Sequence, residues 1–179
     1  MGQPRHRLVL WEFVGMLIGL SVNFRLPNLL LAAGYCLYLA GAFLLARNKE
    51  AFLHGLWFGV SFLIGIAPTL IANAVNAGSP FTTTYGGVDV APPELNPSAL
   101  LSYLVDVQFT LLAISVVWTA WLWRADQGRA KPVALLVAAN LAVNLIFFMT
   151  HPIFTPYYII PIDMLSIWTL LFATLDLRS

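Results

Sequence analysis

The sequence predicts an all-α polytopic membrane protein with about six transmembrane helices and a long extracytoplasmic loop between the third and the fourth. Three observations support this fold class. Hydrophobic residues make up 60% of the 179-residue chain and charged residues only 9%, against about 45–50% and about 25% in soluble domains. Apolar runs of bilayer-spanning length recur along the chain, and one long polar segment, residues 73–103, interrupts them. We expect a single transmembrane domain that covers residues 1–179.

The first half of the chain predicts three spans. An apolar run from Leu8 to about Phe24 is followed by the breaker Arg25-Leu26-Pro27-Asn28 and by a second run from Leu29 to Ala46. At about 1.5 Å per residue, each run just crosses a hydrocarbon core of about 30 Å. The pair therefore predicts a tight transmembrane hairpin, with a re-entrant or tilted pair as the alternative. The polar turn Arg47-Asn48-Lys49-Glu50 precedes a third span, Ala51 to about Asn73.

The polar segment 73–103 cannot lie in lipid, because its many Gly and Pro residues would leave backbone groups unpaired there. It contains no Lys or Arg, which is typical of loops on the extracytoplasmic side. Phe81 and Tyr85 give it apolar surface. We expect both side chains to be buried, because the loop has enough apolar surface to fold onto the helices or onto a partner.

The second half predicts three more spans. Asn96 and Pro97 have the residue types of a helix cap and a first helical turn, and the fourth span extends from there to Trp123. After the polar turn 124–131, Pro132 starts a fifth span that ends at Met149, and Tyr157 to Leu175 forms the sixth.

Basic residues predict the orientation. With both termini in the cytoplasm, eight Lys and Arg residues lie inside and only Arg25 lies outside, as the positive-inside rule favours. The eight are Arg5, Arg7, Arg47, Lys49, Arg124, Arg129, Lys131 and Arg178.

Composition also excludes several kinds of partner. The net charge is +1 and the basic residues are scattered, whereas nucleic-acid binding needs a clustered basic face.

Cys36 is the single cysteine, so an internal disulfide is excluded. We interpret Cys36 as a packed thiol. No spacing of His, Cys and Asp indicates a metal site, and we expect no cofactor.

Four blocks of sequence resemble the later transmembrane half of GT-C glycosyltransferases. They are Gly15-Met16-Leu17-Ile18-Gly19-Leu20, Arg25-Leu26-Pro27-Asn28, the segment from Asn76 to Gly86, and the segment from His151 to Pro161. This family includes protein mannosyltransferases and the aminoarabinose transferases of lipid A. The resemblance implies transfer of a sugar from a polyprenyl phosphate at the extracytoplasmic face, here of a bacterial inner membrane.

The resemblance also implies that two features of GT-C enzymes are missing from these 179 residues. In such enzymes the catalytic carboxylate lies in the first outer loop of an earlier half, which these 179 residues do not include. The family commonly carries an arginine in its last outer loop, where this chain has Thr155-Pro156-Tyr157-Tyr158. We therefore expect a subunit or half-enzyme that contributes a groove for the lipid carrier and is inactive without a partner chain.

Two carboxylates are candidates for the chemistry. An inverting transfer needs a carboxylate that takes the acceptor's proton and a cation that neutralises the departing phosphate. Asp106 and Asp163 are each predicted to lie several residues inside a span, where acidic side chains face a bundle interior or a watery cavity. The alternative for both is a shallow carboxylate that reaches headgroup water.

Arg25, His151 and Tyr158 are the candidate residues for binding the lipid phosphate. A guanidinium at headgroup level suits a pair of phosphate oxygens; ordinary anchoring to phospholipid is the alternative for Arg25, and a helix-end role is the alternative for His151. The candidate outer-loop motif comprises Gly78, Ser79, Pro80, Phe81 and Tyr85.

Two classes of function remain open. One is a GT-C-like sugar-transfer component, and the other is a non-catalytic accessory subunit of a larger membrane complex. A small transporter is a third and weaker alternative, because no internal repeat is visible. Asn140 and Asn144, four residues apart on one helix face, are expected to bond to a neighbouring helix.

Overall fold

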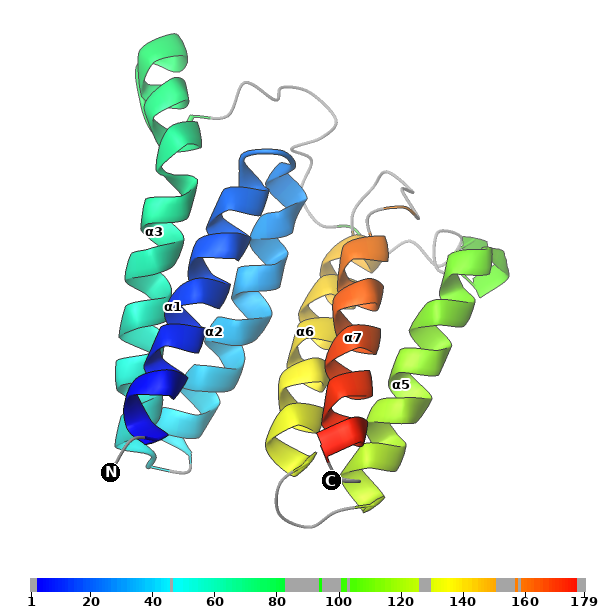
Figure 1. The fold of residues 1–179 in the computed structure, drawn as a ribbon. Helices are drawn as coiled ribbons and strands as arrows, with labels where there is room; N and C mark the ends of the chain where they lie inside the picture. Colours follow the sequence, from blue (N-terminus) through cyan, green and yellow to red (C-terminus); the bar gives the residue numbers. More distant parts are fainter. Residues whose placement is uncertain are drawn as a thin grey trace. The chain divides into compact units, whose positions relative to one another are not determined.

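The computed structural model of the protein describes residues 3–45, 47–82, 94, 101–102, 104–125, 130–150, 157 and 159–176. These residues form six α-helices and no strand (Figure 1). The helices are α1 (Gln3–Val22), α2 (Leu29–Leu44), α3 (Lys49–Ala77), α5 (Val107–Ala125), α6 (Ala130–Thr150) and α7 (Ile160–Asp176), and a 3-10 turn, η1 (Leu26–Asn28), joins α1 to α2.

Four helical segments of the described residues are long and apolar enough to cross a membrane. They are Leu26–Leu44, Lys49–Ala77, Val107–Ala125 and Ala130–Phe148. Val9–Val22 and Ile160–Leu175 are apolar but shorter. The predicted helical fold class is therefore confirmed, and the helices are consistent with an integral membrane protein.

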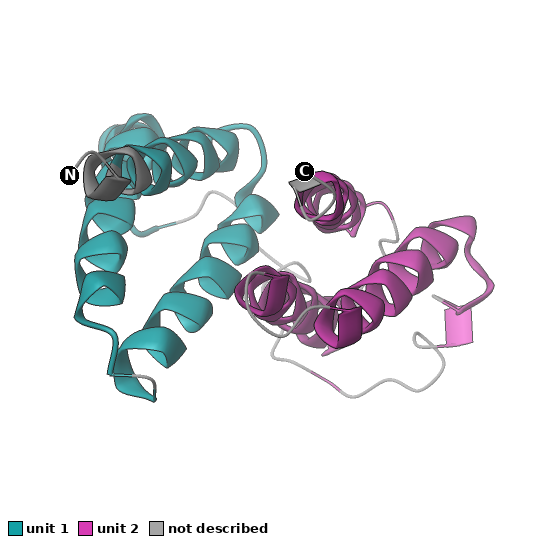
Figure 2. Ribbon diagram, turned by 60° about the horizontal axis from the view of Figure 1, so that its bottom comes forward, with its two compact units in different colours: residues 1–86 teal, residues 87–179 magenta. Residues whose placement is uncertain are grey.

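The chain divides into two compact units, residues 1–86 and residues 87–179 (Figure 2). The first unit contains α1, η1, α2 and α3, and the second contains α5, α6 and α7.

Glycines bring α1 and α3 of the first unit into close backbone contact. A Cβ atom added at Gly15 would collide with the carbonyl oxygen of Phe58, and one added at Gly19 would collide with that of Phe62. From the opposite side, a Cβ at Gly65 would lie 2.6 Å from the carbonyl oxygen of Met16. Gly15 and Gly19 thus form the small-xxx-small pattern that lets helix backbones approach in membranes.

Asn23, just after α1, bonds to α3 where Pro68 interrupts its hydrogen-bond ladder. Asn23 Oδ1 accepts hydrogen bonds from the backbone N–H of Thr69 (2.9 Å) and from its hydroxyl (2.6 Å), and Nδ2 donates to the carbonyl of Gly65 (2.8 Å). Thr69 N–H and Gly65 C=O are the pair that a regular α-helix would bond to each other. A proline in a helix interior disturbs this pairing, and the Asn23 amide satisfies both groups.

An aromatic cluster joins the three helices of the first unit. The Trp11 ring lies 5.9 Å from His54, 6.1 Å from Tyr35, and 6.4 Å from both Tyr38 and Phe58. Phe58 also stacks on Tyr35 at 5.7 Å. Because Phe58 is 1% exposed and Tyr35 is 7% exposed, this cluster is part of the core of the unit.

The turn between α2 and α3 is short. Arg47 adopts a left-handed φ of 54°, and the side chain of Asn48 accepts a hydrogen bond from the N–H of Glu50 (3.0 Å), which caps α3. The predicted break at 25–28 is therefore confirmed, and the one at 47–50 is confirmed in part, because α3 already begins at Lys49. Cys36, however, is exposed on α2, so its interpretation as a packed thiol is wrong for the isolated chain.

Two helix ends differ from the predicted ends. Helix α1 begins at Gln3, before the apolar run, and α3 extends through Asn73 to Ala77. The proposed helix start at Asn96 lies outside the described residues.

The second unit is a three-helix bundle. Trp118 of α5 donates a hydrogen bond from its indole N–H to the Thr174 hydroxyl of α7 (3.0 Å). Lys131 at the start of α6 places its ammonium 5.4 Å from the centre of the Trp123 ring. The backbone N–H of Glu94 bonds to the carbonyl of Thr150 (2.8 Å), which ties this point of the long connection to the end of α6.

Candidate functional site

Asp106 lies at a helix start and not inside a span. Its Oδ1 accepts a hydrogen bond from the N–H of Gln108 (2.8 Å), and its carbonyl accepts one from the N–H of Phe109 (3.0 Å). Leu104 and Val105 before it are helical, Asp106 is in a bend, and α5 begins at Val107. The predicted unbroken helix through Asp106 is therefore wrong, because this carboxylate caps a new helix.

Asp163 lies inside the second unit. It is the fourth residue of α7, its side chain is 0% exposed, and among the described residues neither carboxylate oxygen has a hydrogen-bond partner. A buried carboxylate without a partner is costly in any protein. Such residues in membrane helices mark functional sites by default, so Asp163 remains the stronger of the two candidate carboxylates.

The interior of the second unit carries other buried polar side chains. Ser115 of α5, Asn140 of α6 and Ser166 of α7 are buried, and each has a polar atom without a partner in the described part of the chain. The sequence analysis did not select the two serines. For Ser166 the sequence does contain a signal, because it follows Asp163 by three residues and therefore lies on the same helix face.

The two asparagines of α6 bond within their own helix. Asn140 Nδ2 donates to the carbonyl of Leu136 (3.2 Å), and Asn144 Nδ2 donates to the carbonyl of Asn140 (2.9 Å). Because Asn140 Oδ1 accepts no hydrogen bond, the expected bond from Asn140 to a neighbouring helix is not formed.

Arg25 is the one candidate phosphate-binding residue that the described residues include. It is exposed, its backbone is extended (φ −151°, ψ 118°), and it precedes η1 in the first unit. His151 and Tyr158 lie outside the described residues, so their place beside Arg25 stays a prediction.

The Gly78–Phe81 part of the outer-loop motif ends α3. Gly78 has a left-handed φ of 75°, which favours glycine at a helix C-terminus, and the N–H of Thr82 bonds to the carbonyl of Ser79 (3.2 Å). Asn73 Nδ2 donates to the carbonyl of Pro80 (3.3 Å). Phe81 is 84% exposed, so its expected burial is wrong for the isolated chain. Tyr85 lies outside the described residues.

No group of three His, Cys, Asp or Glu side chains among the described residues could hold a metal ion. Among the described residues, the buried interior of the second unit instead holds one carboxylate together with amide and hydroxyl oxygens. No protein-family model matches the chain, and no curated protein and no solved structure shows significant similarity to it.

Proposed function

We propose that the chain is a membrane subunit of a lipid-linked sugar-transfer system and does not transfer sugar by itself. The observation that carries the second part of this proposal, the lack of transfer by the isolated chain, is the state of the two candidate carboxylates. Asp106 is engaged as a helix cap, and Asp163 is fully buried. A general base must come within hydrogen-bond reach of the proton that it removes; the buried Asp163 does not offer this to an acceptor outside the bundle, and one oxygen of Asp106 is already used as a cap.

The proposed topology has six spans, both termini in the cytoplasm and the connection between α3 and α5 outside a bacterial inner membrane. It is supported by the eight-to-one distribution of basic residues about the helices. Arg25 then lies at the outer interface, where a guanidinium can bind a phosphate of the polyprenyl carrier. His151 and Tyr158 would complete this lipid site, and a partner chain would supply the catalytic carboxylate.

A non-catalytic accessory subunit is the second candidate function. The motif that favours an enzyme, Gly78–Phe81, has a structural role as the end of α3. Its match to GT-C enzymes therefore needs no catalytic explanation. In this case the chain retains the architecture and packs against a partner without binding a lipid carrier.

Binding of a polyprenyl phosphate to the purified full chain separates the two candidates. The GT-C-like subunit is expected to bind the lipid and to lose binding in Arg25→Gln. The matched control is Arg47→Gln, because Arg47 is also exposed and flanks the other end of α2. Binding that is absent, or that both variants weaken equally, would favour the accessory subunit.

Turnover of a polyprenyl-phosphate-linked sugar by the same preparation tests the proposal as a whole. We expect none from the isolated chain. Sustained turnover that Asp163→Asn abolishes would overturn both candidates and make Asp163 the catalytic base.

A further inference from the structure

The unpaired buried polar atoms of the described residues are all in the second unit. They are Gln108 Oε1, Ser115 Oγ, Asn140 Oδ1, Asp163 Oδ1, Asp163 Oδ2 and Ser166 Oγ. Most buried polar atoms in proteins have a hydrogen-bond partner, and a set of exceptions calls for an explanation such as a bound ion or water. The first unit has no such atom among its described residues.

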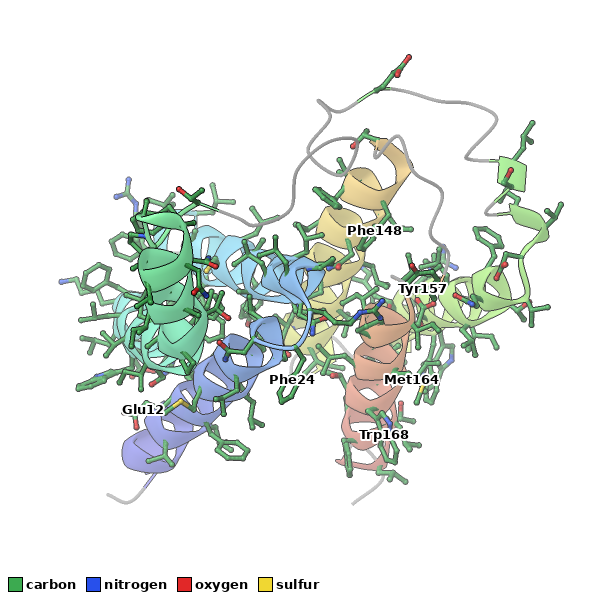
Figure 3. All side chains as sticks on the ribbon, turned by 90° about the horizontal axis from the view of Figure 1, so that it is seen from above. Glu12, Phe24, Phe148, Tyr157, Met164 and Trp168 are labelled. Atoms are coloured by element: carbon green, nitrogen blue, oxygen red, sulfur yellow. The ribbon has the colours of Figure 1, made fainter. Side chains whose placement is uncertain are left out.

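All three helices of the unit contribute to this set, and four of its five residues are buried, whereas Gln108 is half-buried. Ser115 and Asp163 are 0% exposed, Ser166 is 2% exposed and Asn140 is 3% exposed. On α7 the opposite face carries Met164 and Trp168, which are exposed (Figure 3). Asp163 and Ser166 therefore lie on the face of α7 that packs against the other two helices.

The residues succeed one another along the bundle axis. Helices α5 and α7 begin, and α6 ends, at the same end of the unit (Figure 1), which we call the loop end. With a rise of about 1.5 Å per residue from that end, Gln108 lies about 2 Å deep, Asp163 about 5 Å, Ser166 about 9 Å, Ser115 about 12 Å and Asn140 about 15 Å. We call these five residues the polar column.

Apolar side chains close the polar column below Asn140. Deeper in the unit, the fully or nearly fully buried residues include Leu122, Ala134 and Val137. The Thr119 hydroxyl bonds to the carbonyl of Ser115 (2.7 Å) and is not left unpaired. The polar column thus has Gln108 and the charged Asp163 near the loop end and its three other neutral residues farther in, and it ends within the bundle.

The column is richer in acceptors than in donors, because of its unpaired atoms only the two serine hydroxyls can also donate. Four of the six atoms are amide or carboxylate oxygens, which accept hydrogen bonds but cannot donate them when the carboxyl is ionised. The bond from Asn140 Nδ2 to Leu136 fixes the amide so that its oxygen is the unpaired atom. Oxygen acceptors around one negative charge are the donor set of a hard cation.

The charge count selects the class of cation. Calcium sites in proteins use several carboxylates, whereas the polar column has one, and the described residues contain no acidic cluster. A single carboxylate balances a single positive charge. We propose that the polar column binds one partly hydrated alkali-metal cation, with Asp163 as its counter-charge, and that the cation enters from the loop end.

Thermal unfolding of the detergent-purified full chain tests this site. The probes are NaCl, KCl and choline chloride, titrated at constant ionic strength with choline as the replacement ion. We expect Na⁺ or K⁺ to raise the unfolding temperature with saturation, because a ligand that binds only the folded state stabilises it, and choline to leave it unchanged.

Single substitutions test whether the rise in unfolding temperature comes from cation binding at the polar column. Asp163→Asn is expected to abolish the saturable rise, and Ser166→Ala to raise the half-saturating concentration at least about tenfold, which corresponds to about 1.4 kcal/mol. Asp106→Asn is the matched control, since it removes a carboxylate at the same end while keeping a good helix cap, and it should respond as the unmodified chain does.

Three results would overturn the proposal. The first is an unfolding temperature that is the same in all three salts, and the second is a response that Asp106→Asn loses as fully as Asp163→Asn. The third is a response to pH alone, which would indicate a protonated and hydrated Asp163. If Asp163→Asn does not fold, an unchanged half-saturating concentration in Ser166→Ala would equally contradict the site.

Discussion

Replacing Asn23 by alanine tests whether its amide repairs the proline break in α3. The side chain bonds to the N–H of Thr69 at 2.9 Å and to the carbonyl of Gly65 at 2.8 Å, in a partly buried contact. Each backbone group left unpaired in a buried site costs about 1–3 kcal/mol. Because this contact is only partly buried, we expect Asn23→Ala to lower the free energy of unfolding by about 2–3 kcal/mol. Ordinary polar contacts between membrane helices average about 0.6 kcal/mol.

A double-mutant cycle with Pro68→Ala isolates this role. Alanine at position 68 restores an N–H to the ladder of α3 and removes the ring that hinders the 65–69 hydrogen bond. The loss of Asn23 should then cost less, with a coupling energy of about 1 kcal/mol or more. The assay is reversible unfolding of the purified protein in mixed micelles, followed by circular dichroism.

Asn73→Ala is the matched control for the cycle. Asn73 also belongs to α3, but its amide makes a longer bond of 3.3 Å, to Pro80. Its loss should add to that of Pro68 without coupling. A coupling energy below about 0.5 kcal/mol between Asn23 and Pro68 would refute the repair argument, because effects of independent sites add within that margin.

Three further predictions concern packing, capping and topology. Gly15→Ala should destabilise the protein by about 1–3 kcal/mol through overpacking, whereas Gly59→Ala, with no atom within 4 Å of the added Cβ, should be neutral or stabilising in the same unfolding assay; equal effects would contradict the close contact of α1 and α3. Asp106→Ala should cost about 0.5–2 kcal/mol and Asp106→Asn much less, and a loss as large for asparagine would argue against a cap. With the native cysteine replaced, an impermeant thiol reagent applied to intact cells should label Thr83→Cys and not Gln127→Cys, and the reverse result would invert the proposed topology.

The apolar runs predict where the helices are, because burial of apolar surface dominates that choice. Each of the six runs corresponds to a helix of the structure, the break at 25–28 falls where predicted, and the break before α3 ends two residues earlier than predicted. Helix ends are less predictable, because a few hydrogen bonds set them. Asp106 illustrates this: the apolar run passes through it, yet its carboxylate accepts the N–H of Gln108 and starts a helix there.

Contacts between distant segments could not be predicted from local pattern. Asn23 and Thr69 are 46 residues apart, and neither a polar residue in an apolar run nor a proline in a helix indicates that the two will meet. The burial of Asp163 was predicted as one of two alternatives. The buried hydroxyl of Ser115 was not predicted, because a hydropathy profile averages this residue with its apolar neighbours. Only the three-helix packing brings these side chains to one interior.

The division into two units also affects how the protein is made. The hydrogen bonds and ring contacts that we describe for the first unit join residues that precede position 83 in the chain. Ribosomes add about 5–20 residues per second, so synthesis of residues 87–179 takes several seconds more. During this interval all residues that form these contacts of the first three helices have already been synthesised and have reached the translocon. Biogenesis can therefore complete one bundle before the other leaves the ribosome.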